Sequence, residues 1–178
     1  MTINTAAFLF DPETKVGRAN TKKIEAALDA ACMAEFKKPF AKMKFKEDRC
    51  CYAEGDEQFD NNGDVKAGYA GMMVVKASNN SRVDLRNRDK SKVEVVRLED
   101  GTYEAEDDPF YGGCTGEAIV RFYGTKKGGS PGLFASLELC RFTEATESFG
   151  GSAPVDDSIL DDLDDEDDED EDDDGLLD

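Results

Sequence analysis

The sequence contains no histidine and no tryptophan. Histidine is the commonest general base and a frequent metal ligand, so its absence removes most catalytic and zinc-binding arrangements. A Walker loop, a dinucleotide fingerprint and a G-x-S-x-G turn are also missing. We therefore predict a non-enzymatic protein without a cofactor. Because carboxylates are plentiful, a metal-dependent nuclease stays open as an alternative.

Cysteines are few, and long apolar runs are absent. The five cysteines form an odd set without a C-x-x-C pair, which predicts free thiols in a reducing cytosol rather than a zinc site. The stretch DNNGD (60–64) resembles part of a calcium loop, but Val65 stands where that loop requires glycine, so we expect a surface turn without a metal. No signal peptide and no membrane-spanning run are visible, which predicts a soluble intracellular protein.

Negative charge is concentrated at the C-terminal end. The formal net charge is −19, yet residues 156–178 hold 16 acidic residues and no basic ones, leaving 25 acidic against all 22 basic residues in 1–155. Such a run buries too little apolar surface to offset its ordering entropy. The sequence predicts a folded, nearly neutral body at 1–148 and a disordered acidic tail at 149–178.

The apolar pattern of the body is mainly that of strands. Residues 5–10, 69–77 and 93–98 are expected to form strands, and 21–38 an amphipathic helix capped by Asn20 or Thr21 and ended by Pro39. Residues 117–123 and 133–142 alternate around a Gly-rich turn, which predicts a β-hairpin. Its inner face would carry Val120 and Phe122 with Leu133, Ala135, Leu137 and Leu139, and its outer face Arg121, Tyr123 and Phe134.

Two segments of the body are basic. Residues 76–97 carry seven cations against three acids, which predicts a flexible cationic loop between two strands. In residues 37–49 six cations alternate with aromatic residues, a pattern equally typical of a nucleic-acid surface and of a solvated helix end. The first segment, together with the outer hairpin face, favours a surface on which phosphates and bases bind. The role of the second segment, residues 37–49, stays undecided.

The pieces GYAGMMVVKASNN and FYGGCTGEAIVRFYGTKKGGSPGLFASLELCRF resemble phage-encoded single-stranded DNA-binding proteins, functionally akin to the T7 type. The resemblance implies an OB-fold-like five-stranded barrel with one or two helices. It implies sequence-independent binding of single strands in phage DNA replication, recombination or repair, in the cytoplasm of the infected bacterium. It also implies a tail that recruits replication proteins such as a DNA polymerase or helicase. A homodimer is one alternative for the oligomeric state.

We predict that cations and rings of the body bind single-stranded DNA, and that the tail competes for the same groove and then binds protein partners. The main alternative is an acidic chaperone or DNA mimic that acts through the tail. The predicted DNA-binding residues are Lys76, Arg82, Arg86, Arg88, Lys90, Lys92, Arg121, Tyr123, Lys126, Lys127 and Phe134, with Tyr69, Phe110 and Tyr111 as weaker candidates. The predicted partner-binding tail residues are Asp156, Asp157, Asp172, Asp173, Asp174, Leu176, Leu177 and Asp178.

Overall fold

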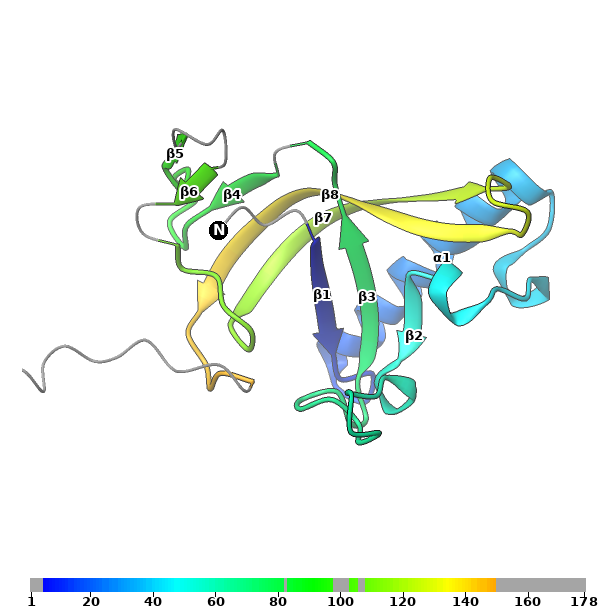
Figure 1. Cartoon of the computed structure of the whole chain (residues 1–178), viewed down its shortest axis with the longest axis horizontal. Helices are drawn as coiled ribbons and strands as arrows, with labels where there is room; N and C mark the ends of the chain where they lie inside the picture. The colour runs from blue at the N-terminus through cyan, green and yellow to red at the C-terminus, as the bar shows by residue number, and fades with distance from the viewer. Residues whose placement is uncertain (1–4, 82, 98–102, 106–107, 150–178) are drawn as a thin grey trace, which may run out of the picture.

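The computed structural model describes residues 5–81, 83–97, 103–105 and 108–149, and shows a mainly β protein with one α-helix (Figure 1). This confirms the predicted fold class. The predicted tail, apart from Phe149, lies outside the described residues. The elements are β1 (Thr5–Phe10), α1 (Lys15–Phe36), η1 (Phe40–Lys42), η2 (Glu47–Arg49), β2 (Tyr52–Glu54), η3 (Gly55–Glu57), β3 (Met73–Ser78), β4 (Asp84–Arg86), β5 (Val95–Arg97), β6 (Tyr103–Ala105), β7 (Thr115–Thr125) and β8 (Gly132–Glu144).

Six of the strands form one sheet in the order β1-β3-β8-β4, with β2 also on β3 and β7 also on β8. The strands β3 and β8 meet in parallel at Ser78 and Ser136, while β5 and β6 form a separate two-stranded sheet. The expected strand at 5–10 is confirmed. The strand expected at 69–77 begins only at Met73, because a turn in which Met72 N–H bonds Tyr69 C=O precedes it.

The predicted hairpin is the longest β unit of the molecule. The strands β7 and β8 pair antiparallel, with Tyr123 opposite Phe134 and Val120 opposite Leu137. Arg121 and Tyr123 are exposed while Val120 and Phe122 pack against the core, which confirms the predicted faces of the first strand. The hairpin crosses the whole molecule and carries its turn at the end where α1 also ends (Figure 1).

The inner face of β8 differs from the prediction beyond Leu137. The register shifts between Ile119 and Val120, so that Glu138 is an extra residue on β8. A bulge of this kind reverses the alternation for the residues that follow it. Consequently Cys140 is buried in place of Leu139, which instead pairs with the exposed Ile119.

The helix begins six residues before the predicted start. Thr14 is its N-cap and accepts a 2.9 Å hydrogen bond from Gly17 N–H at Oγ1, so the predicted caps Asn20 and Thr21 are wrong. The amphipathic pattern covered only the part of α1 that packs on the sheet, and for this reason it missed the first turns. At the other end Lys37 adopts a left-handed conformation with φ 59° and closes the helix before Pro39.

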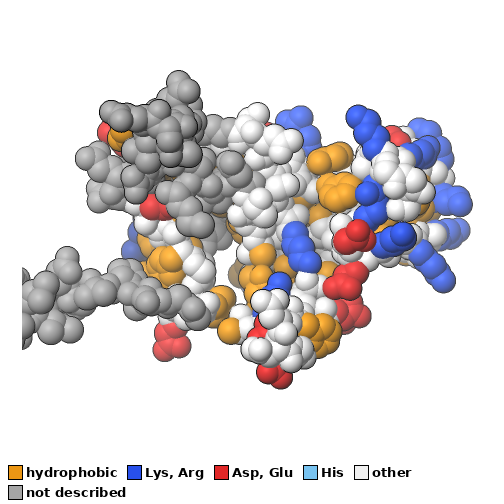
Figure 2. Space-filling view, viewed as in Figure 1, with side chains coloured by type: hydrophobic (Ala, Val, Ile, Leu, Met, Phe, Trp, Pro, Cys, Tyr) orange, Lys and Arg blue, Asp and Glu red, His pale blue; other side chains and the backbone are white. Residues whose placement is uncertain are grey.

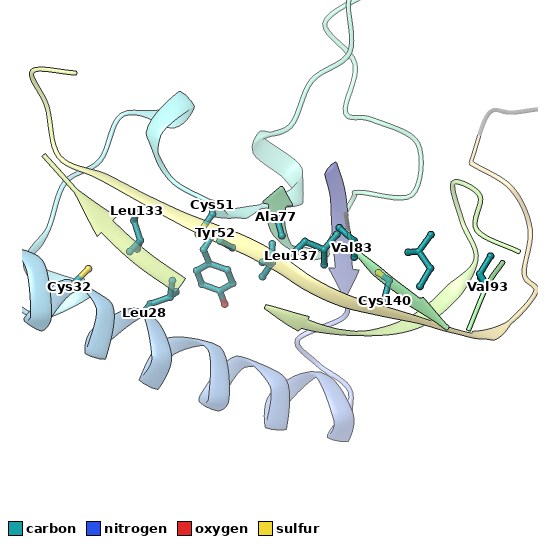
Figure 3. Close-up of a cluster of buried hydrophobic side chains, with 13 residues drawn as sticks. Leu28, Cys32, Cys51, Tyr52, Ala77, Val83, Val93, Leu133, Leu137 and Cys140 are labelled. Atoms are coloured by element: carbon teal, nitrogen blue, oxygen red, sulfur yellow. The ribbon is translucent and has the colours of Figure 1, made fainter. Parts of the chain in front are cut away.

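One part of the core lies between α1 and the hairpin, and the buried cluster continues along β8 to Val83, Cys140 and Val93 (Figure 3). Leu28 and Cys32 of α1, and Leu133 and Leu137 of β8, have no exposed surface. Near the turn, α1 approaches β7 so closely that a methyl group on Gly124 would lie 2.8 Å from the Phe36 ring. The hairpin turn is therefore held against the C-terminal end of α1.

The cysteines are all free thiols, and the buried ones contribute to this packing. Burial raises the pKa of Cys51 to about 12 and that of Cys140 to about 11, so both thiols are protonated at neutral pH. Within the described ranges no group of three or more acidic, cysteine or histidine side chains is arranged to hold a metal ion. In the same part of the chain, no helix is long and apolar enough to span a membrane.

The stretch 60–64 is an exposed surface turn, as predicted. The Asp60 carboxylate accepts hydrogen bonds from the backbone N–H groups of Asn62 at 2.8 Å and Asp64 at 3.1 Å. These bonds stabilise the charged form and lower the pKa of Asp60. The carboxylate thus stabilises the turn itself.

Candidate nucleic-acid interface

The outer hairpin face, which we define as Arg121, Tyr123 and Phe134, presents two rings and one cation side by side. The ring centroids of Tyr123 and Phe134 lie 6.0 Å apart, and Tyr123 is 47% exposed. The Arg121 side chain is 78% exposed, and its guanidinium lies 3.9 Å from the Glu138 carboxylate. A solvent-facing ring next to a highly exposed cation is an arrangement on which a nucleobase and its phosphate can bind.

Arg49 joins a distant segment to this face. Its guanidinium carbon lies 5.5 Å from the centroid of the Phe134 ring, a cation–π contact. Its Nη2 also donates a 2.5 Å hydrogen bond to the carbonyl of Lys127 in the hairpin turn. The role of the basic segment 37–49 stayed undecided from the sequence. In the structure, Arg49 connects this segment to both the hairpin turn and the outer hairpin face.

The alternation of lysine and aromatic residues in this segment has a structural cause. Phe45 packs 5.9 Å from Phe36 and 6.3 Å from Phe40, and Phe40 lies 6.3 Å from Tyr52 in the core. The rings therefore turn inward and hold the segment in place, while the lysines turn outward. These rings therefore stabilise the fold.

The exposed lysines of the segment meet those of the hairpin turn and form one cationic surface (Figure 2). None of them has a carboxylate within ion-pairing distance among the described residues. Unpaired cations attract a polyanion without first giving up a partner. We call this surface the basic end, and it consists of Lys37, Lys38, Lys42, Lys44, Lys46, Lys126 and Lys127.

Where a flexible loop was predicted within 76–97, residues 83–92 form a short strand followed by a tight turn. β4 pairs in parallel with residues 139–141 of β8, and Asn87 N–H bonds Ser91 C=O across the turn. Arg86 is one of the predicted DNA-binding cations. It forms a 2.7 Å ion pair with Asp84 and is therefore already neutralised within the body. The remaining cations of the turn that the structure describes, Arg88, Lys90 and Lys92, are exposed, while Arg82 lies outside the described residues.

This turn and the basic end do not form one compact surface. Residues 139–141, where β4 pairs, are five to seven residues along β8 from Phe134, which corresponds to roughly 20 Å. The pairing of strands distant in the sequence sets this separation. The expectation that the turn adjoins the exposed rings of the hairpin is therefore wrong, although a strand of several nucleotides could still contact both.

The three weaker aromatic candidates have partners within the body. Phe110 packs edge-on against Phe142 at 6.2 Å, and Tyr69 lies against the Lys66 ammonium at 5.8 Å in the loop before β3. The Tyr111 hydroxyl donates to the carbonyl of Thr146 at 2.7 Å and accepts from its N–H at 2.8 Å. None of these rings lies on the outer hairpin face.

The bond to Tyr111 belongs to a strap that holds the chain after β8. Phe149 N–H donates to Gly112 C=O at 2.8 Å, and the Phe149 ring lies over Gly68, where a methyl group would be 2.7 Å away. The strap, residues 146–149, holds the last described residues against the body. They lie at the end of β8 opposite the basic end (Figure 1). The predicted tail residues, Asp156 to Asp178, lie outside the described residues.

The outer hairpin face yields a direct prediction. Changing Arg121 and Tyr123 together to alanine removes one cation and one stacking surface, so we expect affinity for a single-stranded oligonucleotide to fall about tenfold. Fluorescence anisotropy of a labelled oligonucleotide measures this. Ile119→Ala, on the same strand and equally exposed, is the control and should leave affinity unchanged. Unchanged affinity of the double variant would remove the outer hairpin face from the interface.

The comparisons with known proteins agree with one another. The family model described as "Enterobacter phage Enc34, ssDNA-binding protein" matches residues 7–174. The solved single-stranded DNA-binding protein from bacteriophage Enc34 has a TM-score of 0.61 at 19% identity, over 88% of this chain and 76% of that chain. Its structure in complex with ssDNA gives the same TM-score and identity over 82% of this chain and 73% of that chain. These likenesses establish the shared fold.

A curated relative comes from another phage. Putative protein p50 of Acyrthosiphon pisum secondary endosymbiont phage 1 is 32% identical over 116 residues, which is 65% of this chain. The matched part is 53% of that relative, so the chain spans about half of its length.

Proposed function

Because the chain belongs to the family of phage single-stranded DNA-binding proteins represented by that of Enterobacter phage Enc34, we propose that it binds single-stranded DNA through the basic end and the outer hairpin face. The observation that carries this proposal is the position of Arg49. This side chain contacts both the Phe134 ring and the hairpin turn, and so joins the lysine-rich segment 37–49 to the lysine-bearing turn beside the outer hairpin face.

Most of this surface has the chemistry to bind single-stranded DNA of any sequence. The lysines neutralise phosphates and release counterions, while Tyr123 and Phe134 offer flat faces that any base can stack on. Duplex bases are already stacked on one another, so exposed rings favour unpaired strands. The protein acts by binding and carries out no chemistry. It takes part in DNA replication, recombination or repair in the cytoplasm of the infected host.

The acidic tail competes with DNA for the basic end. From the strap to the hairpin turn, β8 spans 13 residues, or about 40 Å. The 29 residues that follow Phe149 have a root-mean-square reach of about 30 Å as a flexible chain and about 100 Å when extended. The tail can therefore reach the basic end of its own body. Once DNA displaces it, the tail is free to bind replication proteins such as a polymerase or helicase.

Removal of the tail tests this competition. A version that ends at Phe149 is expected to bind labelled oligo-thymidine about tenfold more tightly than the full chain at low salt, where the Debye length is longest. The difference should disappear at about 1 M salt, where charges are screened within about 3 Å. Equal affinities of the two versions at low salt would contradict a competing tail.

The same titration separates the proposal from an acidic chaperone or DNA mimic. A protein of that kind needs no basic end, so its tail-free body would not bind single strands at any salt concentration. Binding by the tail-free body that weakens steadily with salt supports the proposed interface. An intact oligonucleotide after incubation with magnesium would exclude the nuclease alternative.

A further inference from the structure

An open pocket lies between β3 and β8 beside η2, next to the interface. Phe134 lines it and also belongs to the outer hairpin face, so the pocket opens where the exposed rings meet the basic segment. Lys76 lines it from β3, and Glu47 and Asp48 line it from η2. None of the steps in the proposed function uses these two carboxylates.

The pocket combines groups that match the parts of one nucleotide. Lys76 is half-buried, and within the described part of the chain no carboxylate pairs with its ammonium, which is therefore available to a phosphate. The Phe134 ring supplies an apolar surface against which a flat base packs. Glu47 and Asp48 supply only hydrogen-bond acceptors.

Carboxylates in a phosphate-binding surface need an explanation, because they repel the backbone of the ligand. Among the described ion pairs neither Glu47 nor Asp48 takes part, although Lys46 and Arg49 flank them in the sequence. A carboxylate accepts hydrogen bonds from an amino group on a base and repels a carbonyl oxygen at the same place. Cytosine carries an amino group at position 4, whereas thymine carries a carbonyl oxygen there.

We propose, on the basis of the proposed function, that this pocket seats one nucleotide of the bound strand and favours cytosine over thymine. Phe134 packs against the base, Lys76 contacts the phosphate, and the carboxylates of Glu47 and Asp48 accept from the cytosine amino group. The remainder of the interface binds without regard to sequence, so the pocket adds a local base preference to a general single-strand binder.

The test compares labelled oligo-cytidine and oligo-thymidine of about 12 nucleotides, bound to the full chain at mildly alkaline pH, where cytosine is unprotonated. We expect the natural chain to bind oligo-cytidine about fivefold more tightly, within the range of discrimination by amino-to-carboxylate contacts. In Glu47→Gln with Asp48→Asn the ratio should fall to about one, because the neutral amides offer donors as well as acceptors.

A matched control removes the same two charges elsewhere. Glu57→Gln with Asp64→Asn lies in the exposed loop after β2 and should keep the cytosine preference of the natural chain. Equal binding of both oligonucleotides by the natural chain would overturn the proposal. So would equal tightening of both by the Glu47 and Asp48 changes, since the carboxylates would then only repel phosphate. Binding of neither oligonucleotide would overturn the proposed function as well.

Discussion

Changing Lys42, Lys44, Lys126 and Lys127 together to glutamine is expected to weaken binding of single-stranded DNA about a hundredfold at moderate salt. Each lysine that neutralises a phosphate contributes about 0.7 to the slope of log affinity against log salt for single strands. The variant should therefore lose about three units of that slope as well as affinity. Anisotropy titrations at several salt concentrations measure both quantities.

The control for this experiment removes four exposed lysines outside the basic end. Lys15, Lys22 and Lys23 lie on α1 and Lys66 lies in the loop before β3, and all four are exposed. Their change to glutamine lowers the net charge equally, so it reproduces any effect of overall charge. The same loss in both variants would show that the basic end has no special part in binding.

Leu137→Ala is expected to lower the free energy of unfolding by about 3 kcal/mol. Leu137 has no exposed surface, and the deletion leaves a cavity between β8 and the elements that cover it. Urea unfolding followed by circular dichroism measures the change. Leu139→Ala, two residues further along the same strand, should cost about 1 kcal/mol, because Leu139 lies beyond the bulge and is only half-buried.

The order of these two costs tests the bulge at Glu138. Strict alternation along β8 would place Leu137 and Leu139 on the same buried face and predict similar losses. An equal or larger loss for Leu139→Ala would therefore contradict the register in which Leu139 pairs with Ile119.

The sequence predicted the parts of the fold that depend on local patterns. Alternation placed Tyr123 outside and Val120 inside because neighbouring strand residues point to opposite faces. The bulge was not predictable, because one extra residue leaves the apolar composition of β8 unchanged and appears only when the strand is paired with β7. The true cap Thr14 was missed because the first turns of α1 carry no apolar stripe.

The proposed interface was only half predictable for a similar reason. The hairpin residues could be named from the sequence because one short segment holds both rings and cations. The segment 37–49 carried a basic signal whose role the sequence left undecided, and nothing in the sequence says that Arg49 reaches a turn 78 residues away. The sequence also suggested that the basic turn after β4 lies near the outer hairpin face. Pairing of β4 with the far half of β8 separates the two.

The strap and the basic end lie at opposite ends of β8. Hydrogen bonds from residues 146–149 to Tyr111 and Gly112 hold the last described residues at one end of β8, about 40 Å from the turn that carries the basic end. We propose, as a consequence of the proposed function, that copies coating one strand would turn their lysine-rich ends toward the nucleic acid and their straps away from it. An enzyme approaching such a strand would then meet the acidic tails before the DNA.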